Sequence, residues 1–141
     1  MKRIRVNDAR AANVREFNEW MYRNRDKNHF DPEMFTYPSM HILAAEDNDG
    51  LVLFLPFHAV IMSDSLAPKP GASRLKISLA LRECVYRLLE EAKRYGAGEI
   101  YFVAQDEETK QFAKSQGYEE MQGTVMRLKA KDVPTLEDRP Q

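Results

Sequence analysis

The sequence predicts an α+β fold from three observations. Two long stretches, 9–25 and 74–95, repeat apolar residues at helical spacing. Several short runs of apolar or alternating residues lie around them, which is typical of strands. Turn formers over 47–50 separate two such runs and indicate a β-hairpin. We therefore expect a mixed, mostly antiparallel sheet that is flanked by helices.

The first half of the chain is expected to hold four strands and one long helix. Residues 3–6 alternate polar and apolar side chains, so they predict a short, half-buried strand. Asn7 and Asp8 follow with side-chain oxygens that can cap the helix over 9–25, and the polar stretch 24–39 predicts a loop. Three apolar runs bounded by turn residues predict the other strands, at 40–46, 51–57 and 59–66.

A long helix and a buried strand are expected next. Ser73 is expected to cap the helix over 74–95, and Gly96 ends it because glycine tolerates a left-handed backbone. The near-continuous apolar run within 99–105 predicts a strand that is buried on both faces.

The end of the chain is expected to close the sheet. Asp106 is a suitable cap for a short helix that ends at Gly117. Two closing strands are predicted at 118–121 and 124–129. The complete order is then β-α-β-β-β-α-β-α-β-β. Residues 1–130 form one domain in this interpretation, and 131–141, with two prolines and no apolar period, form a flexible tail.

Composition and charge narrow the class of protein. Hydrophobic residues make up 43% of the 141 residues and charged residues 30%, so the chain can bury a core. The 21 basic and 22 acidic residues leave a formal net charge of −1, which argues against a nucleic-acid binder. The longest apolar run, 51–61, contains Pro56 and is too short to span a bilayer. With one cysteine, the sequence predicts no disulfide framework and a cytoplasmic protein without a membrane partner.

Other chemistry-bearing residues are scattered. The three histidines His29, His41 and His58 lack the spacing of a metal site, so no metal is expected, although His58 lies where it can touch a ligand. Cys84 lies on the apolar stripe of the second helix and is expected to be a buried, inert thiol. The aromatic residues of the loop either line a pocket for an acceptor or anchor the loop to the core. They are Phe30, Phe35 and Tyr37.

The second half of the sequence shows a specific order of motifs. It reads LLEEAKRYG at 88–96, IYFVA at 100–104, FAKSQGYE at 112–119 and VMRL at 125–128. This arrangement resembles the GNAT superfamily of N-acetyltransferases, and the resemblance covers about residues 3–130. It implies a GNAT-like fold. It also implies an acetyltransferase that moves an acetyl group from acetyl-CoA directly to an amine on a small molecule or a protein.

The resemblance implies an acetyl-CoA site at the start of the second helix. Members of the superfamily bind the pyrophosphate there through a glycine-rich loop whose backbone N–H groups approach the phosphates. This chain has no glycine over 74–81, and the nearest one is Gly71. Arg74 and Lys76 are either phosphate ligands or solvated charges of the first helical turn. The expected cofactor-binding residues are Leu66, Gly71, Ala72, Ser73, Arg74, Lys76, Val103 and Asp106.

The resemblance also assigns a catalytic base. Superfamily bases are often acids on the fourth strand, which here gives Asp64 as the group that takes a proton from the attacking amine. Strand alternation places Asp64 on one face with Val60 and Met62, where half-burial raises a carboxyl pKa. The alternative is a strand-end acid that points into water. Ala113 stands where many members carry a tyrosine that protonates the leaving thiolate, and that role is not transferred to Tyr118.

Two functions therefore stay open. The first is acyl transfer from acetyl-CoA, supported by Arg74, Lys76 and a strand pair expected to open near Leu66 and Val103. The second is a catalytically inactive GNAT-like binding or assembly protein, supported by the missing glycines and by Ala113. Small proteins of this degenerate kind occur in bacteriophage, so a phage or virion association is expected for the second. A two-fold homodimer is the default assembly, and exposed apolar residues of the last strands are where its interface is expected.

Overall fold

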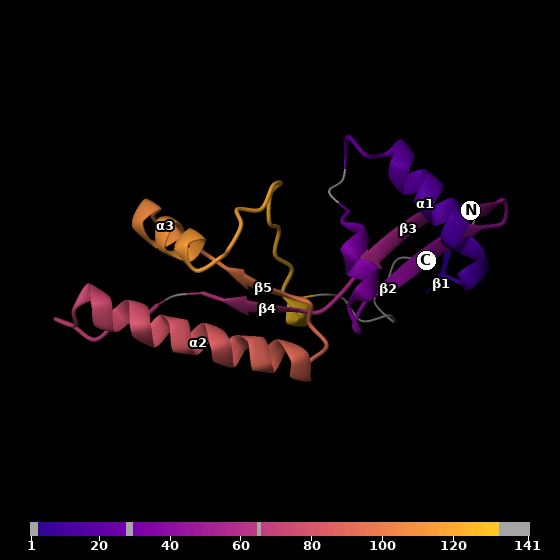
Figure 1. Ribbon diagram of the computed structural model, residues 1–141. Helices are drawn as coiled ribbons and strands as arrows, with labels where there is room; N and C mark the ends of the chain where they lie inside the picture. Colours follow the sequence, from indigo (N-terminus) through magenta and orange to yellow (C-terminus); the bar gives the residue numbers. More distant parts are fainter. Residues whose placement is uncertain (1–2, 28–29, 65, 133–141) are drawn as a thin grey trace.

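The computed structural model describes residues 3–27, 30–64 and 66–132 and has an α+β architecture (Figure 1). Its strands and α-helices are β1 (Arg5–Asp8), α1 (Val14–Arg23), β2 (His41–Asp47), β3 (Gly50–Phe57), β4 (Val60–Ser63), α2 (Arg74–Arg94), β5 (Glu99–Phe102) and α3 (Glu107–Ser115). Three short 3-10 helices are η1 (Ala11–Asn13), η2 (Pro32–Thr36) and η3 (Ala130–Asp132). The strands form two sheets, β1-β2-β3 and β4-β5.

The first sheet is antiparallel and contains the hairpin that the sequence predicts. Strand β2 pairs with β1 on one side and with β3 on the other, with a register shift between Ala45 and Glu46. The turn between β2 and β3 is closed by Asp47, whose carboxylate accepts a hydrogen bond from the Asp49 N–H at 2.8 Å. Gly50 follows with a φ of 123°, which a residue with a side chain rarely adopts.

A small aromatic core lies between this sheet and α1. Phe17 of α1 is 1% exposed and packs against Ala44 of β2 and Phe54 of β3. Phe30 and Phe35 meet the Phe17 ring edge to face, with centroids at 5.3 Å and 5.7 Å, a favourable arrangement for aromatic pairs. These two loop residues are therefore anchors, which is one of the two interpretations that the sequence left open.

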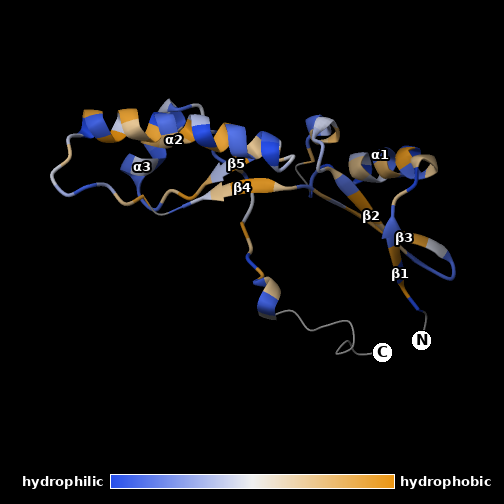
Figure 2. Cartoon of the chain, turned by 90° about the horizontal axis from the view of Figure 1, so that it is seen from below, coloured by the Kyte–Doolittle hydropathy of each residue, from blue (hydrophilic) through white to orange (hydrophobic). Residues whose placement is uncertain are grey.

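The second sheet has two parallel strands joined by a long helix. Strands β4 and β5 pair over Val60↔Glu99 to Ser63↔Phe102, and α2 crosses between them and packs on both. As predicted, the Ser73 side chain caps α2 by accepting from the Lys76 N–H at 3.2 Å. Figure 2 shows hydrophobic and hydrophilic residues alternating along α2, as an amphipathic helix requires.

The first strand and the first helix differ from the prediction. The strand spans Arg5–Asp8 and is exposed along its length, so Asn7 and Asp8 are strand residues rather than helix caps. The expected helix over 9–25 is divided into η1 and the shorter α1. Where η1 begins, the Arg10 N–H donates to the Asn13 side chain at 3.0 Å. The backbone pairing of β1 with β2 uses the residues that the sequence pattern assigned to the cap.

The prediction of two closing strands is wrong for the described residues. Residues 118–129 carry no strand, and the expected strands at 59–66 and 99–105 are shortened to Val60–Ser63 and Glu99–Phe102. The chain turns back onto α3 instead: the Tyr118 N–H donates to the Ala113 carbonyl at 3.1 Å. Glu120 then forms ion pairs with Lys110 at 2.9 Å and with Lys114. A strand needs backbone partners on a neighbouring strand, and the hydrogen bond and ion pairs given above join this segment to α3 instead.

Within the part of the chain that the structure describes, no helix combines the length and the apolar composition that crossing a bilayer requires.

The proposed tail over 131–141 falls largely on residues 133–141, which lie outside the described residues. Lys131 and Asp132 belong to η3.

We expect Gly98→Ala to destabilise the fold at the contact between the two sheets. A Cβ atom on Gly98 would overlap the ring of Tyr37, so the ring must move and its hydrogen bond to Glu99 is lost. The unfolding free energy measured in urea should fall by about 2 kcal/mol. In a Tyr37→Ala background the same substitution should cost less than about 0.5 kcal/mol. Equal costs in both backgrounds would contradict this explanation.

Candidate functional site

The candidate site lies at the carboxyl ends of the parallel strands β4 and β5. In sheets of parallel strands, ligands commonly bind beyond these ends, where the loops lead into helices. Here the chain leaves β4 after Ser63 and enters α2, and it leaves β5 after Phe102 and enters α3. Both helices therefore begin downstream of the same edge of the sheet.

A pocket of about 350 Å³ lies at this edge, between α2 and α3. Most of its lining is apolar, and the polar groups are few. The residues from the strand ends are Ser63, Asp64, Leu66 and Phe102. Those from α2 are Leu81, Cys84, Val85, Arg87 and Leu88, and those from α3 and the residues after it are Phe112, Ala113, Gln116 and Tyr118. A mostly apolar cavity with a few polar groups is typical of a small-molecule site.

The structure places Asp64 at the mouth of this pocket, directly after β4. Its side chain is exposed, as is Met62 on the same face. The expectation of a half-buried carboxyl is therefore wrong, and the alternative of a strand-end acid in water is confirmed. Burial fails because β4 ends at Ser63, so no neighbouring strand covers the next residue.

The pairing of β4 and β5 ends close to Val103, where the sequence predicted the strand pair to open, and the opening itself stays a prediction. The Val103 N–H still donates to the Ser63 carbonyl at 3.1 Å, so the two chains stay paired one residue beyond β5. Leu66 lies three residues after β4 and lines the pocket, whereas Val103 does not. Any separation of the two chains begins after Ser63 and Val103.

The residues expected to hold phosphates lie around the first turn of α2. Gly71 has a φ of 81° and Ala72 donates its N–H to the Lys69 carbonyl at 3.0 Å, so the loop turns tightly before the Ser73 cap. Arg74 forms an ion pair with Glu108 in the first turn of α3. The Lys76 side chain is exposed, while its N–H is held by the cap. The sequence alone gave no sign that Glu108 faces Arg74.

Asp106 caps α3 as predicted. Its carboxylate accepts from the Thr109 N–H at 2.7 Å, and this hydrogen bond lowers the pKa of Asp106. The side chain is exposed and is occupied by the cap. Asp106 thus fixes the first turn of α3, and Glu108 in that turn pairs with Arg74 at the start of α2.

Two pocket residues have places that the sequence did not predict. Cys84 was expected to be buried, but it is exposed and lines the pocket. Tyr118 is half-buried beside Phe102, with ring centroids 5.9 Å apart, and burial raises the pKa of its phenol. The return of residues 118–120 onto α3 brings Tyr118 next to Ala113. Gly117, with a φ of 97°, is the local signal for the turn, but it does not predict which residues Tyr118 contacts.

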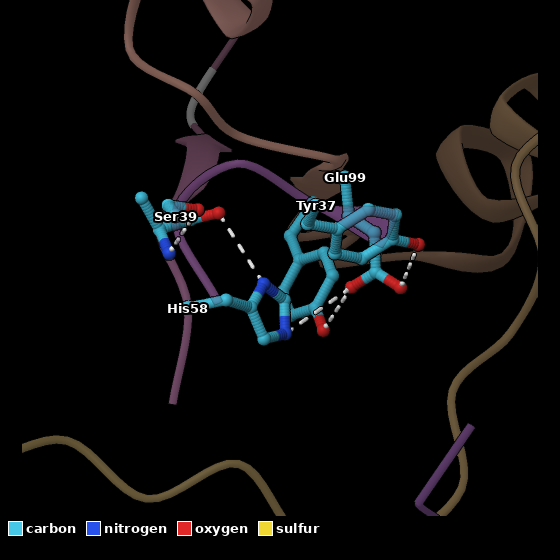
Figure 3. A network of polar contacts seen from close by, with 6 residues as sticks. Tyr37, Ser39, His58 and Glu99 are labelled. Carbon is cyan, nitrogen blue, oxygen red and sulfur yellow. Dashed lines mark hydrogen bonds and ion pairs between the residues drawn. The ribbon is translucent and has the colours of Figure 1, made fainter. Parts of the chain in front are cut away.

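A polar network lies at the amino ends of β4 and β5, at the opposite end of these strands from the pocket (Figure 3). Glu99, the first residue of β5, accepts hydrogen bonds from the Tyr37 hydroxyl at 3.1 Å and the Tyr101 hydroxyl at 2.9 Å. His58 Nε2 lies 3.8 Å from the same carboxylate, and its ring packs near Tyr37. The Ala59 N–H donates to the Ser39 hydroxyl at 3.1 Å. The network joins the loop before β2 to the second sheet.

The network holds both phenols in their protonated form. Burial, followed by the hydrogen bond to Glu99 and its negative charge, raises the pKa of Tyr37 and of Tyr101 to about 12. Both hydroxyls thus donate to the carboxylate over the whole physiological range. Tyr37 and His58 serve here as structural contacts, and neither lines the pocket at the other end of the strands.

Among residues 3–27, 30–64 and 66–132, no group of three or more histidine, cysteine or acidic side chains is arranged to hold a metal ion. The groups with the chemistry to hold an anion near the pocket are Arg74, Arg87 and Lys76.

No protein-family model matches the sequence, and no curated protein matches it at a significant level. Solved structures show a partial likeness, and two of them are described here. An integron cassette protein from the mobile metagenome of V. cholerae is 17% identical, with a TM-score of 0.41 over 90% of this chain and 93% of that chain. A ribosomal-protein-alanine N-acetyltransferase from Brucella melitensis biovar Abortus 2308 is 13% identical, with a TM-score of 0.34 over 89% and 99%. Neither TM-score is high enough to define a shared fold.

We expect Tyr37→Phe to destabilise the protein by about 1 kcal/mol at pH 8, because the hydrogen bond to Glu99 is lost. The pKa of Tyr37 is about 12 in the folded protein and about 10 when unfolded, so its stabilisation is complete below pH 10 and lost as the pH rises toward 12. Urea unfolding at pH 8 and pH 11 should therefore show a smaller difference between wild type and variant at pH 11.

Tyr22→Phe on the exposed side of α1 is the matched control. It should change the unfolding free energy by less than about 0.5 kcal/mol at pH 8. If the loss of unfolding free energy caused by Tyr37→Phe is larger at pH 11 than at pH 8, the hydrogen bond to Glu99 is not what raises the pKa of Tyr37.

Proposed function

We propose that this chain is an acetyltransferase of the GNAT type, which binds acetyl-CoA at the carboxyl ends of β4 and β5 and transfers the acetyl group to an amine. The observation that carries the proposal is the mostly apolar pocket of about 350 Å³ at this edge, between the two helices that start there. The resemblance of 88–128 to the motifs of that superfamily agrees with the position of the pocket.

The pocket suits the pantetheine arm and the acetyl thioester of this donor. Leu81, Val85 and Leu88 on α2 and Phe112 on α3 provide apolar walls for the chain of the arm. Burial of apolar surface contributes about 25 cal/mol per Å² to such binding. At the strand end, the Ser63 hydroxyl donates to the Tyr101 carbonyl, and its oxygen can accept a hydrogen bond from an amide N–H of the arm.

The diphosphate is proposed to bind beside the first turn of α2. Free N–H groups and the helix dipole favour an anion at a helix start, whereas the start of α3 carries Asp106, Glu107 and Glu108, whose negative charges repel one. Arg74 and Lys76 add positive charge on α2. Arg74 is paired with Glu108 in the free protein, so the phosphates must compete with a carboxylate for its guanidinium. Arg74 and Glu108 are both exposed, so breaking their ion pair to bind a phosphate costs little free energy, because solvent screens their attraction.

The proposed reaction is a direct transfer. The neutral amine attacks the thioester carbonyl, a carbon–nitrogen bond forms, and the carbon–sulfur bond breaks to release the thiolate of CoA. Asp64 at the pocket mouth accepts the proton that the amine loses. Tyr118, which lines the same pocket, donates its phenolic proton to the leaving sulfur. Tyr118 takes this role because the structure brings it beside Ala113, where the superfamily tyrosine is missing.

A non-catalytic assembly protein is the alternative. The observation that favours it is a bare apolar face on the first sheet, which includes Leu53, Leu55 and Phe57. A phage or virion association belongs to this alternative. Turnover of acetyl-CoA with any amine of a panel contradicts it, whereas an absence of binding heat at high micromolar acetyl-CoA removes the acetyltransferase proposal.

We expect Cys84→Phe to weaken acetyl-CoA binding at least ten-fold in isothermal titration calorimetry. Cys84 lines the pocket and is exposed, so the larger phenyl ring should project into the proposed acetyl-CoA site and block it. It should not disturb the packing of the protein interior. Cys84→Ser keeps the volume and should change the dissociation constant less than two-fold. Equal weakening by both variants would place the ligand elsewhere or give the thiol itself a role.

We expect Asp64→Asn to lower kcat by about 100-fold or more with little change in acetyl-CoA affinity, because the general base is lost while the pocket is kept. Tyr118→Phe should lower kcat in the same assay. Glu83→Gln, on the exposed side of α2, is the control and should leave kcat unchanged. If Asp64→Asn retains the wild-type rate, water rather than Asp64 removes the proton.

A further inference from the structure

A second pocket, of about 330 Å³, lies beside the first sheet. Its lining comes from the end of β1, η1, the start of α1, η2 and the start of β2. It shares no lining residue with the pocket between α2 and α3, and Figure 1 shows α1, β1 and β2 away from those two helices. Small-molecule sites span about 300–1,000 Å³, so this volume suits a small ligand.

The walls of this pocket are apolar side chains that the fold leaves open. Phe35 of η2 meets the ring of Phe17 in the aromatic core at 5.7 Å and is still 44% exposed. Val14, the first residue of α1, is 47% exposed. Met40 and Ile42 are half-buried and line the pocket with them. Covering such walls with the apolar body of a ligand removes their surface from water, which favours binding.

The polar groups at the η1 end of the pocket are hydrogen-bond donors. Arg10 has an exposed side chain, and it forms no ion pair within the part of the chain that the structure describes. The Asn13 side-chain oxygen accepts the Arg10 N–H at 3.0 Å, which turns the NH₂ group of Asn13 to the other side of the amide. A guanidinium and an amide NH₂ both donate, so together they suit a negatively charged acceptor such as a carboxylate.

Two further residues of the lining, Asp8 and His41, have side chains on the other face of the sheet. Asp8 pairs with Leu43, and strand alternation places Leu43 opposite to its neighbour Ala44, which is buried under α1. His41 stacks on the ring of its β3 partner at 5.3 Å, on the same face as Asp8. Arg10 is therefore the charged side chain that is left to the pocket.

We propose that this pocket binds a small carboxylic acid with an apolar body, such as an aromatic ring on a short chain. The carboxylate binds beside Arg10 and the NH₂ group of Asn13, and the body packs against Phe35 and Val14. A guanidinium can hold a carboxylate through two parallel hydrogen bonds, which neither an alcohol nor an ammonium group can accept. The proposal does not depend on acetyl-CoA binding at the other pocket.

NMR titration of the full chain tests the proposal with three probes that share a phenyl ring and differ in charge. They are phenylacetate, 2-phenylethanol and 2-phenylethylamine. Each is added up to about 20 mM, because a ligand of about ten heavy atoms binds in the millimolar range. We expect phenylacetate to give saturable shifts of the backbone amides that line the pocket, including those of Ala11 and Phe35. It should bind about ten-fold more tightly than the amine, because Arg10 attracts the carboxylate and repels the ammonium group.

Arg10→Gln tests the role of the guanidinium. Phenylacetate should bind the wild type about three-fold more tightly than 2-phenylethanol does, since an ion pair with an exposed side chain contributes little. Arg10→Gln should remove this preference and leave the affinity for the alcohol unchanged. Arg15→Gln is the matched control, because Arg15 is an exposed arginine of α1 that does not line the pocket. It should keep the preference, and the amide spectrum shows whether each variant is folded.

Four results overturn the proposal. The first is the absence of saturable shifts at the lining residues up to about 20 mM phenylacetate. The second is equal affinity for the three probes, and the third is a preference that survives Arg10→Gln or that Arg15→Gln removes. The fourth is loss of the phenylacetate shifts when acetyl-CoA is added, which would place both ligands in one site. Phenylacetate binding to a chain that does not bind acetyl-CoA supports this proposal while the proposed function fails.

Discussion

The carboxylate of Glu99 is the contact on which the arrangement of the two sheets depends. It accepts hydrogen bonds from Tyr37, in the loop that follows the aromatic core, and from Tyr101, in its own strand. His58 approaches the same carboxylate from the short connection between β3 and β4. Three segments far apart in the sequence thus meet on one acid at the start of β5. Gly98 makes this possible, because any side chain there would occupy the space of the Tyr37 ring.

The position of the candidate site follows from fixing β5 at its amino end. Once β5 lies parallel to β4, the starts of α2 and α3 come after the same edge of the pair, and the pocket forms between the two helices. The Ser73 and Asp106 caps hold the two helix starts, and the Arg74–Glu108 ion pair spans them. The chemistry proposed for this edge uses side chains that are placed by packing and capping rather than by a shared sequence motif.

The face of the first sheet that carries Leu53, Leu55 and Phe57 shows the opposite situation, in which packing within the chain is incomplete. Burying an apolar side chain such as Leu55 contributes about 2 kcal/mol, so a face with several exposed ones forgoes a large part of the possible stabilisation. The aromatic core around Phe17 is small, and the parallel pair β4–β5 has two strands only. Two-stranded sheets are marginally stable by themselves.

The sequence by itself determined the α+β class, the β2–β3 hairpin, the limits of α2 and the Ser73 and Asp106 caps, because each depends on neighbouring residues. It placed the candidate site at the carboxyl ends of β4 and β5 and named Asp64 as the base. It did not decide whether Asp64 is exposed, and it did not predict that Cys84 is exposed or that Tyr118 lines the pocket. Only the tertiary structure decided that residues 118–129 form no strand, since Gly117 predicts a turn after α3 but no local pattern predicts that Glu120 meets Lys110. Strand formation and burial depend on partners distant in sequence, whereas turns and caps are decided within a few residues.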